Sequence, residues 1–417
     1  MPETCRHSGY AFTDHLITVP LDHADPTGMT IELFARELVA VEREEADLPF
    51  LLYLEGGPGH RAPRAIPGWL ERASREYRVV LLDQRGTGRS TPATRQTLTD
   101  LPDPAGYLRH FRADSIVRDA ELLRAHLAGD RPWSVLGQSF GGFCALTYLS
   151  LAPEGLREVL IAGGLPSLTA SPYEVYLAAY PRVLAHNERF FARYPRDQEV
   201  ARRVVDHLLE NEVALPNGDR LTPRRFQTVG LVLGQENRFD SLHHLLEEPF
   251  IGKGELSDAF LRGVDSLVSF AGHPLYALLH EAIYCQGEAS AWAAERALAG
   301  FPEFGLEPGA PVRFTGEMIF PWLFEEDAAL APLRSCARDL AAHASWPSLY
   351  DPDRLARNTV PVAAAIYYDD MYVHREHSLR TAGMVGGLTF WITNEHAHDG
   401  LSRGGAVLDR LIRMTRR

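Results

Sequence analysis

The sequence has few cysteines and no long apolar run. Its four cysteines lie far apart, without a CxxC pair and without Cys and His at metal-ligand spacing. We therefore expect free thiols in a reducing compartment, not disulfides or zinc ligands. No run of about 18 apolar residues occurs, which argues against a membrane-spanning helix. The cysteines are Cys5, Cys144, Cys285 and Cys336.

The N-terminus and the charge balance exclude further classes of protein. The opening segment, MPETCRHSGYAFTDH, is polar and lacks the apolar region of a secretory signal peptide, so a cytoplasmic location is expected. The net charge is -13 at pH 7, whereas nucleic-acid binding requires clustered Lys and Arg. We expect no nucleic-acid and no membrane partner, and a neutral or cationic substrate.

Hydrophobic patterning predicts alternating strands and helices in the first part of the chain. Continuous apolar runs such as PFLLYL and YRVVLLD are typical of strands buried on both faces of a parallel sheet. Alternation of strand and helix indicates a doubly wound α/β sheet. The expected strands are residues 15–21, 29–39, 49–54, 77–83, 133–136 and 158–162, and the expected helix is 112–128.

The pattern changes after Gly163-Gly164. Residues 165–355 show helical periodicity and few strand signals, and buried-strand patterns return at 360–367 and 388–393. A helical block that interrupts a parallel sheet indicates a cap over the carboxyl edge, where such folds bind ligands. We therefore predict a mostly parallel α/β core in residues 1–164 and 356–417, with an inserted helical cap in 165–355.

The motif G-x-S-x-G occurs at Gly137-Gln138-Ser139-Phe140-Gly141. It follows a predicted strand and precedes a predicted helix over 143–151, which is the setting of a nucleophile elbow. Small residues two before and two after the Ser allow the strand and helix backbones to approach. The alternative is a Gly-rich turn with an idle Ser, but the correct flanks on both sides favour Ser139 as the nucleophile of an α/β-hydrolase fold.

A second glycine-rich segment, Glu55-Gly56-Gly57-Pro58-Gly59, closes the strand 49–54. In α/β-hydrolases the loop after this strand and the residue after the nucleophile each supply one oxyanion-hole N–H. Here these are the N–H of Gly56 or Gly57 and that of Phe140. The alternative is an ordinary Gly-Pro turn.

The segment DQRGTGRS, residues 83–90, is a weak candidate for phosphate binding. It lacks the full G-x-G-x-x-G pattern and a Walker Lys. A structural role, in which Asp83 and Arg85 hold the loops beneath the site, is favoured.

GGPG after the third strand, DQRGTGRS after the fourth and GQSFGG at the elbow together resemble the prolyl aminopeptidases (proline iminopeptidases), which are α/β-hydrolase serine peptidases. The segments LHEAIYCQG, FTGEMIFPW, YYDDMYV and NEHAHDG are similar in order and spacing to the larger branch of that family, with chains of roughly 400 residues. The resemblance covers most of the chain. It departs from the commonest pattern at Glu55, where many members have His.

The resemblance implies an acid after strand 360–367 and a His after strand 388–393, and catalysis needs the same chain order of Ser, Asp and His. Two acids and two histidines compete. Asp370, directly before Met371, matches the family's Asp-Met step and is favoured over Asp369. His398 matches the family's His before Asn/Asp-Gly and is favoured over His396.

An aminopeptidase must hold the free ammonium of its substrate, and buried carboxylates do this well. The resemblance suggests a pair of cap glutamates for this role. Glu281 and Glu317 stand in apolar stretches and are the candidates, with Glu325 as a reserve. The alternative is that these are helix-surface or salt-bridged glutamates.

The resemblance implies an exopeptidase that releases N-terminal proline from peptides through an acyl-enzyme, without cofactor or metal. Its partners would be peptides with a free N-terminal proline. One alternative is an esterase or amidase of the same fold that acts on a small metabolite. A second is a non-catalytic binding module with the same fold.

Overall fold

The computed structural model describes residues 4–252 and 254–416, without the side chain of residue 236. In these residues nine strands form one sheet, in the order β1-β2-β3-β5-β4-β6-β7-β8-β9. The part of the sheet from β1 through β2 and β3 to β5 is antiparallel. The part from β5 through β4, β6, β7 and β8 to β9 is parallel. The predicted α/β-hydrolase fold is confirmed. The strands are β1 (Thr4–His7), β2 (Tyr10–Pro20), β3 (Thr30–Ala40), β4 (Phe50–Leu54), β5 (Arg78–Leu82), β6 (Trp133–Gln138), β7 (Leu156–Ala162), β8 (Val362–Tyr367) and β9 (Leu388–Thr393).

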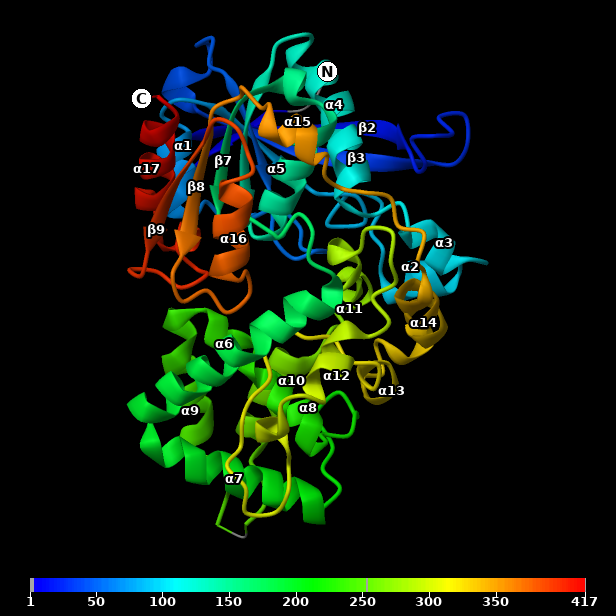
Figure 1. Cartoon of the computed structure of the whole chain (residues 1–417), viewed down its shortest axis with the longest axis vertical. Coiled ribbons are helices and arrows are strands. Elements are labelled where there is room, and N and C mark those ends of the chain that lie inside the picture. Colours follow the sequence, from blue (N-terminus) through cyan, green and yellow to red (C-terminus); the bar gives the residue numbers. More distant parts are fainter. Residues whose placement is uncertain (1–3, 253, 417) are drawn as a thin grey trace.

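Helices cover both faces of the sheet because the central strands are apolar on both sides. In β4, Leu51 and Tyr53 belong to a core cluster with α1 (Gly68–Ala73) and α17 (Ala406–Thr415). The alternate residues, Phe50, Leu52 and Leu54, belong to a second cluster that includes α4 (Ala113–Ala128) and α5 (Phe140–Leu151). Figure 1 shows α1 and α17 on one side of the strands and α4, α5 and α16 (Arg375–Ala382) on the other.

One predicted strand differs from expectation in its burial. The run LTFWIT predicts a strand buried on both faces, but Phe390 and Ile392 are 45% and 41% exposed. Because β9 is the last strand of the sheet, its side chains have strand neighbours on one side only. On the other face, Trp391 packs against the core cluster of α17 and lies 4.5 Å from the guanidinium of Arg410.

Most helices between β7 and β8 lie beyond the carboxyl ends of the parallel strands (Figure 1). The exception is α15, which returns beside α5 on the sheet. The division into core and cap at residues 165 and 355 stays a prediction. The helices of this segment are α6 (Pro172–Arg193), α7 (Pro195–Glu210), α8 (Pro223–Gln227), α9 (Phe239–Glu247), α10 (Asp258–Val268), α11 (Pro274–Leu279), α12 (Ala293–Leu298), α13 (Leu323–Glu326), α14 (Arg334–Ala342) and α15 (Pro352–Ala356).

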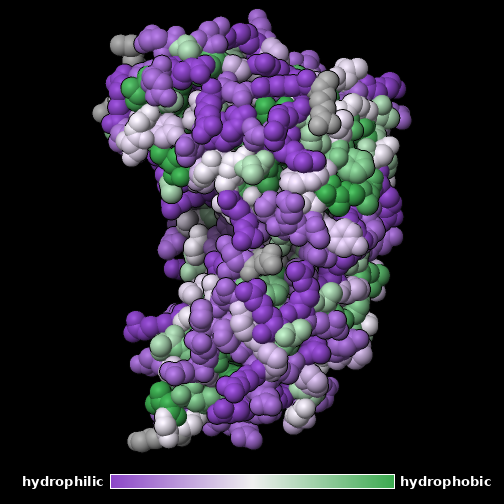
Figure 2. Space-filling view, turned by 90° about the vertical axis from the view of Figure 1, so that its left-hand side faces the viewer, coloured by the Kyte–Doolittle hydropathy of each residue, from purple (hydrophilic) through white to green (hydrophobic). Residues whose placement is uncertain are grey.

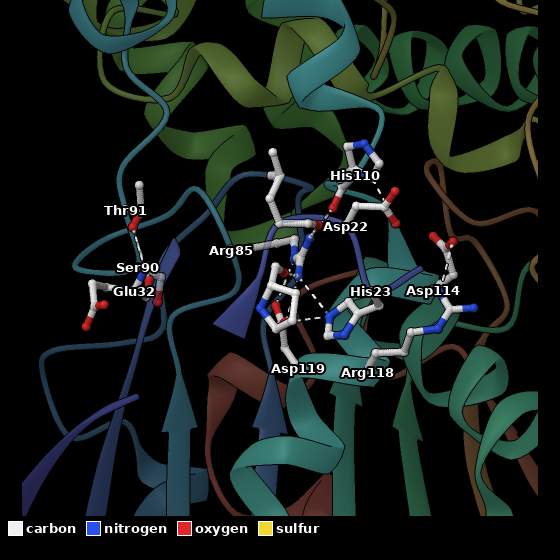
Figure 3. A network of polar contacts seen from close by, with 12 residues as sticks. Asp22, His23, Glu32, Arg85, Ser90, Thr91, His110, Asp114, Arg118 and Asp119 are labelled. Atoms are coloured by element: carbon white, nitrogen blue, oxygen red, sulfur yellow. Dashed lines mark hydrogen bonds and ion pairs between the residues drawn. The ribbon is translucent and has the colours of Figure 1, made fainter. Parts of the chain in front are cut away.

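Arg85 holds together the loops near the carboxyl edge of the sheet, as the sequence predicts. Its guanidinium is fully buried and binds both oxygens of Asp119 on α4, at 2.6 and 2.7 Å. It also donates to the carbonyls of Leu21 and His110, and His23 contacts the same carboxylate at 2.9 Å (Figure 3). One buried cation therefore joins the β2–β3 turn, the loop after α3 (Pro104–Leu108) and α4.

Asp83, two residues before Arg85, also joins loop segments. It is fully buried and accepts the N–H groups of Ala62 and Arg89, at 3.1 and 2.8 Å, as well as hydrogen bonds from Arg64. The structural role predicted for DQRGTGRS is thus confirmed.

The four cysteines are free, and three of them are buried. Burial raises the pKa of the Cys285 and Cys336 thiols to about 12, so neither is a reactive thiolate at neutral pH.

We expect the melting temperature to be unchanged by dithiothreitol in a thermal-unfolding measurement, because the cysteines are free. A melting temperature that collapses with the reductant would contradict this.

None of the helices in the described part of the chain is long and apolar enough to cross a membrane.

Candidate active site

Ser139 lies at the sharp turn between β6 and α5, with φ 53° and ψ −122°. This conformation is sparsely populated by non-glycine residues and costs about 1–3 kcal/mol. The turn depends on small neighbours. A Cβ on Gly137 would lie 2.3 Å from the carbonyl oxygen of Gly141, and one on Gly141 would lie 1.9 Å from that of Leu54. The strained backbone holds Ser139 at the carboxyl edge of the sheet.

His398 and Asp370 meet at the same edge, from the loops after β9 and β8. The Nδ1 atom of His398 lies 2.8 Å from Oδ2 of Asp370, and both side chains are buried. The other carboxylate oxygen, Oδ1, accepts the N–H groups of Tyr372 and Val373 at 2.9 and 3.0 Å. Asp370 is therefore fixed by its own loop and can orient the imidazole so that Nε2 faces away from the acid.

The two competing neighbours have other surroundings. The carboxylate of Asp369 is 39% exposed and lies 3.4 Å from the guanidinium of Arg189. The ring of His396 contacts Tyr367 edge-on, and its Nδ1 has no hydrogen-bond partner among the described residues. Neither side chain lines the cavity around Ser139. The geometry thus favours Asp370 and His398, the residues preferred from the sequence.

The charges around His398 favour its protonated form. Burial alone lowers the pKa of His398, but the charge and hydrogen bond of Asp370 and the charges of Glu317 and Asp399 outweigh it. The pKa of His398 is consequently raised above 6.5. A raised pKa makes the imidazole a stronger base for the hydroxyl proton of Ser139.

The two glycines predicted for the oxyanion hole are not equivalent. The N–H of Gly56 donates to Oε1 of Glu55 at 2.9 Å, so it is already engaged. Gly57 follows with φ 127°, a conformation that favours glycine. Phe140 is the first residue of α5, and the N–H groups of a first helical turn have no partner within the helix. Which glycine N–H joins that of Phe140 in an oxyanion hole stays a prediction.

Ser139 and His398 line one cavity of about 440 Å³ between the sheet and the helical segment. Figure 2 shows the surface indented between the upper and the lower part of the molecule. Several aromatic rings and three carboxylates share the cavity with the predicted nucleophile. The lining residues are Tyr53, Glu55, Gly56, Gly57, His60, Pro63, Pro67, Trp69, Gln138, Ser139, Leu231, Gln235, His273, Tyr276, Glu317, Tyr372, His398, Asp399, Leu401 and Ser402.

Glu317 is the one predicted cap glutamate that reaches this cavity. Its Oε1 accepts the hydroxyl of Tyr276 at 2.7 Å, and Oε2 lies 4.0 Å from Nε2 of His280. Its charge also contributes to the raised pKa of His398. Glu317 and Ser139 therefore line the same cavity, and a cation bound there would be attracted by this carboxylate.

The structure does not bring Glu281 to the cavity. Its carboxylate is buried and accepts the N–H groups of Ala293 and Ala294, at 3.1 and 2.9 Å, at the start of α12. A carboxylate in that place satisfies helix N–H groups that would otherwise lack partners. The reserve candidate Glu325 is more than half exposed and lies 3.5 Å from Arg334. Neither carboxylate lines the cavity that holds Ser139.

Two further acids of the cavity, Glu55 and Asp399, were not predicted as functional residues. Glu55 stands directly before the glycines of the oxyanion loop, and Asp399 directly after His398. Their only sequence signal is this adjacency. Among the described residues, only His243, His244 and Glu247 lie close enough together to share a metal ion, and they are on α9, outside the cavity.

Known proteins resemble this chain in sequence and in fold. Residues 49–271 match the family model described as alpha/beta hydrolase fold. A proline iminopeptidase of Aeromonas sobria is 52% identical over 408 residues, which cover 96% of each chain. A proline iminopeptidase of Aspergillus aculeatus is 38% identical over 414 residues, covering 96% of this chain and 91% of the relative.

Among solved structures, esterase E22 aligns with a TM-score of 0.51 at 10% identity, covering 97% of this chain and all of that chain. At this identity the likeness shows the fold alone. The two sequence relatives extend over nearly the whole chain, and the family model covers more than half of it. The chain therefore belongs to the proline iminopeptidase family of α/β-hydrolases.

Proposed function

We propose that this protein is a serine exopeptidase that releases N-terminal proline from peptides. The observation that carries the proposal is one cavity that holds Ser139, the buried His398–Asp370 pair and the carboxylate of Glu317. Membership of the proline iminopeptidase family, with relatives of that name, supports it.

In this proposal Ser139 attacks the carbonyl carbon of the first residue, and Nε2 of His398 takes the hydroxyl proton. Asp370 fixes the imidazole and stabilises the imidazolium that forms. The N–H of Gly56 or Gly57 and that of Phe140 bind the developing oxyanion. His398 then protonates the leaving nitrogen as the amide bond breaks. Water attacks the acyl-enzyme in the reverse roles and releases free proline.

Glu317 would hold the ammonium of the N-terminal proline. Its Oε1 is fixed by Tyr276, while Oε2 lies 4.0 Å from Nε2 of His280, beyond hydrogen-bonding distance. Burial lowers the pKa of His280, so the imidazole is neutral near pH 7 and does not compete as a cation. A secondary ammonium would supply the charge-assisted hydrogen bonds that an acylated nitrogen lacks.

We expect Glu317→Gln to lower kcat/KM for prolyl naphthylamide by roughly 10²-fold, because the ammonium loses an ionised partner. The wild type should reject N-acetylprolyl naphthylamide, and the variant should discriminate less between the two substrates. Steady-state kinetics on both substrates measures this. Glu325→Gln is the matched control, since that carboxylate is exposed and outside the cavity.

Equal hydrolysis of the free and the acetylated substrate by the wild type would contradict the exopeptidase proposal and leave an esterase or amidase. Discrimination that survives Glu317→Gln would place the amine site on another residue. Labelling of Ser139 by a small fluorophosphonate checks that the variant remains folded.

A further inference from the structure

His398 stands on a loop that the sheet supports on one side only. The loop follows β9, the last strand, whose one neighbouring strand is β8. The hydrogen bond to Asp370 fixes Nδ1 but leaves the ring free to tilt about that contact. A catalytic group must be held within about 0.5 Å of its productive geometry. Contacts beyond the sheet are therefore needed to hold the imidazole.

Tyr372 contacts both members of the His398–Asp370 pair. Its backbone N–H donates to Oδ1 of Asp370 at 2.9 Å. Its ring meets the imidazole of His398 edge to face, with 4.8 Å between the ring centroids and 82° between the ring planes. Two rings packed in this way restrict each other's rotation. One residue thus limits both the position of the acid and the tilt of the base.

The ring of Tyr372 is itself held by the helical segment between β7 and β8. Its hydroxyl donates to the carbonyl of Leu231 in the 3-10 helix η3 (Thr228–Gly234). The same ring packs on Gly234, the last residue of η3. A Cβ on Gly234 would lie 2.0 Å from Cζ of Tyr372. The 3-10 helix therefore holds the tyrosine both at its hydroxyl and along its ring.

Two further contacts join η3 to the catalytic loops. The backbone N–H of His398 donates to the carbonyl of Gly234 at 3.1 Å. The two ring nitrogens of His186 on α6 lie 2.8 and 2.7 Å from the carbonyl oxygens of Leu233 and Asp369. The loop after β8 and the loop after β9 are thus both tied to the same 3-10 helix.

We propose that Tyr372 is a positioning residue, which is anchored on η3 and keeps the imidazole of His398 aligned between Asp370 and Ser139. The inference rests on the catalytic roles in the proposed function, but not on the identity of the substrate. It gives the helical segment a part in the chemistry as well as in substrate recognition. Tyr372 transfers no proton in this role, because its hydroxyl is engaged with Leu231.

Tyr372→Phe removes the hydroxyl anchor and keeps the ring. We expect the rate of Ser139 labelling by a small fluorophosphonate, and kcat for prolyl naphthylamide, to fall by roughly three- to tenfold, as for the loss of one buried hydrogen bond. The matched control is Tyr180→Phe. It removes another buried hydroxyl, which donates to the carbonyl of Ala294 at 2.8 Å within the helical segment. Both rates should be unchanged in that variant.

A pH series separates positioning from a loss of stability. Burial lowers the pKa of His398, but the surrounding charges, above all that of Asp370, raise it further, and Tyr372→Phe changes none of them. An imidazole that tilts away from Asp370 loses part of this effect, so its pKa falls. Because the base must be neutral to act, the acid limb of kcat/KM should then move to lower pH. Tyr180→Phe should leave the limb in place.

Gly234→Ala tests the same contact from η3. The added Cβ must displace the ring of Tyr372, so the labelling rate and the acid limb should move in the same direction as in Tyr372→Phe. The labelling rate should fall by roughly 10²-fold, the loss expected when a catalytic group is misplaced by about 1 Å. Gly263→Ala on α10 is the matched control, because its Cβ would meet Cδ1 of Leu245 at 2.5 Å, outside the cavity. It should leave the rate unchanged.

Unchanged labelling rates in Tyr372→Phe and Gly234→Ala would overturn the inference, and so would a fall in rate with an unmoved acid limb or an equal loss in Tyr180→Phe. Thermal melts show that each variant is folded, and Tyr372→Phe decides alone if Gly234→Ala does not fold. Failure of the proposed catalytic roles gives a different result. In that case Asp370→Asn and His398→Ala would be labelled as fast as the wild type.

Discussion

Ser139→Ala should lower kcat for prolyl naphthylamide by about 10⁴–10⁶-fold, the loss expected when the nucleophile of a triad is removed. The remaining groups can still bind and polarise the substrate, but no acyl-enzyme forms. Alanine keeps a Cβ, so the strained turn at φ 53° is not changed further and the variant should fold. Steady-state kinetics and a thermal melt on the same preparation measure both effects.

Two controls separate chemistry from structure in this experiment. Ser241→Ala removes an exposed hydroxyl on α9, outside the cavity, and should leave kcat unchanged. A fluorophosphonate should label the wild type and Ser241→Ala but not Ser139→Ala. A folded Ser139→Ala enzyme that turns over within tenfold of the wild type would remove Ser139 from the mechanism.

The sequence predicts the sheet and the elbow well because both depend on local patterns. Runs such as PFLLYL contain apolar residues at every position, and the structure uses both faces of that strand. The elbow motif works because steric contact demands its glycines. A Cβ on Gly141 would lie 1.9 Å from a carbonyl oxygen of β4. Every residue type other than glycine has a Cβ and would clash there.

Local patterns fail where the outcome depends on distant parts of the chain. The apolar neighbours of Glu281 correctly indicate burial, but they do not say which groups the carboxylate meets. Its partners are the N–H groups of Ala293 and Ala294 at the start of α12, 12 and 13 residues further along the chain. In β9, likewise, nothing in LTFWIT distinguishes an edge strand from a central one, because the missing neighbour is a property of the whole sheet.

The two further acids of the cavity were missed for a related reason. Asp399 is adjacent to a predicted catalytic residue, yet sequence gives no information on whether a carboxylate finds donors. That depends on the loop path between His398 and Leu401, which leaves both oxygens of Asp399 without hydrogen bonds to the described residues. In the sequence, Glu55 stands out only as a departure from the family pattern. Its placement in the cavity follows from the turn of the oxyanion loop.

Asp370→Asn should lower kcat by about 10⁴-fold, because an amide cannot stabilise the imidazolium and can hold His398 in the wrong tautomer. His398→Ala should have a comparable or larger effect. The structural basis is the 2.8 Å contact between Nδ1 of His398 and Oδ2 of Asp370, away from water. The measurement is kcat for prolyl naphthylamide across a pH series.

The neighbours provide matched controls, since Asp369→Asn and His396→Ala make the same chemical changes one or two positions away. Both should stay within about tenfold of the wild type, as expected of side chains outside a catalytic unit. The pH series adds a second test. Asp370 raises the pKa of His398, and the base must be neutral to act, so activity falls below this pKa. In the residual activity of Asp370→Asn the acid limb should therefore move to lower pH, whereas Asp369→Asn should leave it in place. A larger loss in Asp369→Asn than in Asp370→Asn, or an unmoved limb in Asp370→Asn, would assign the acid to the wrong neighbour.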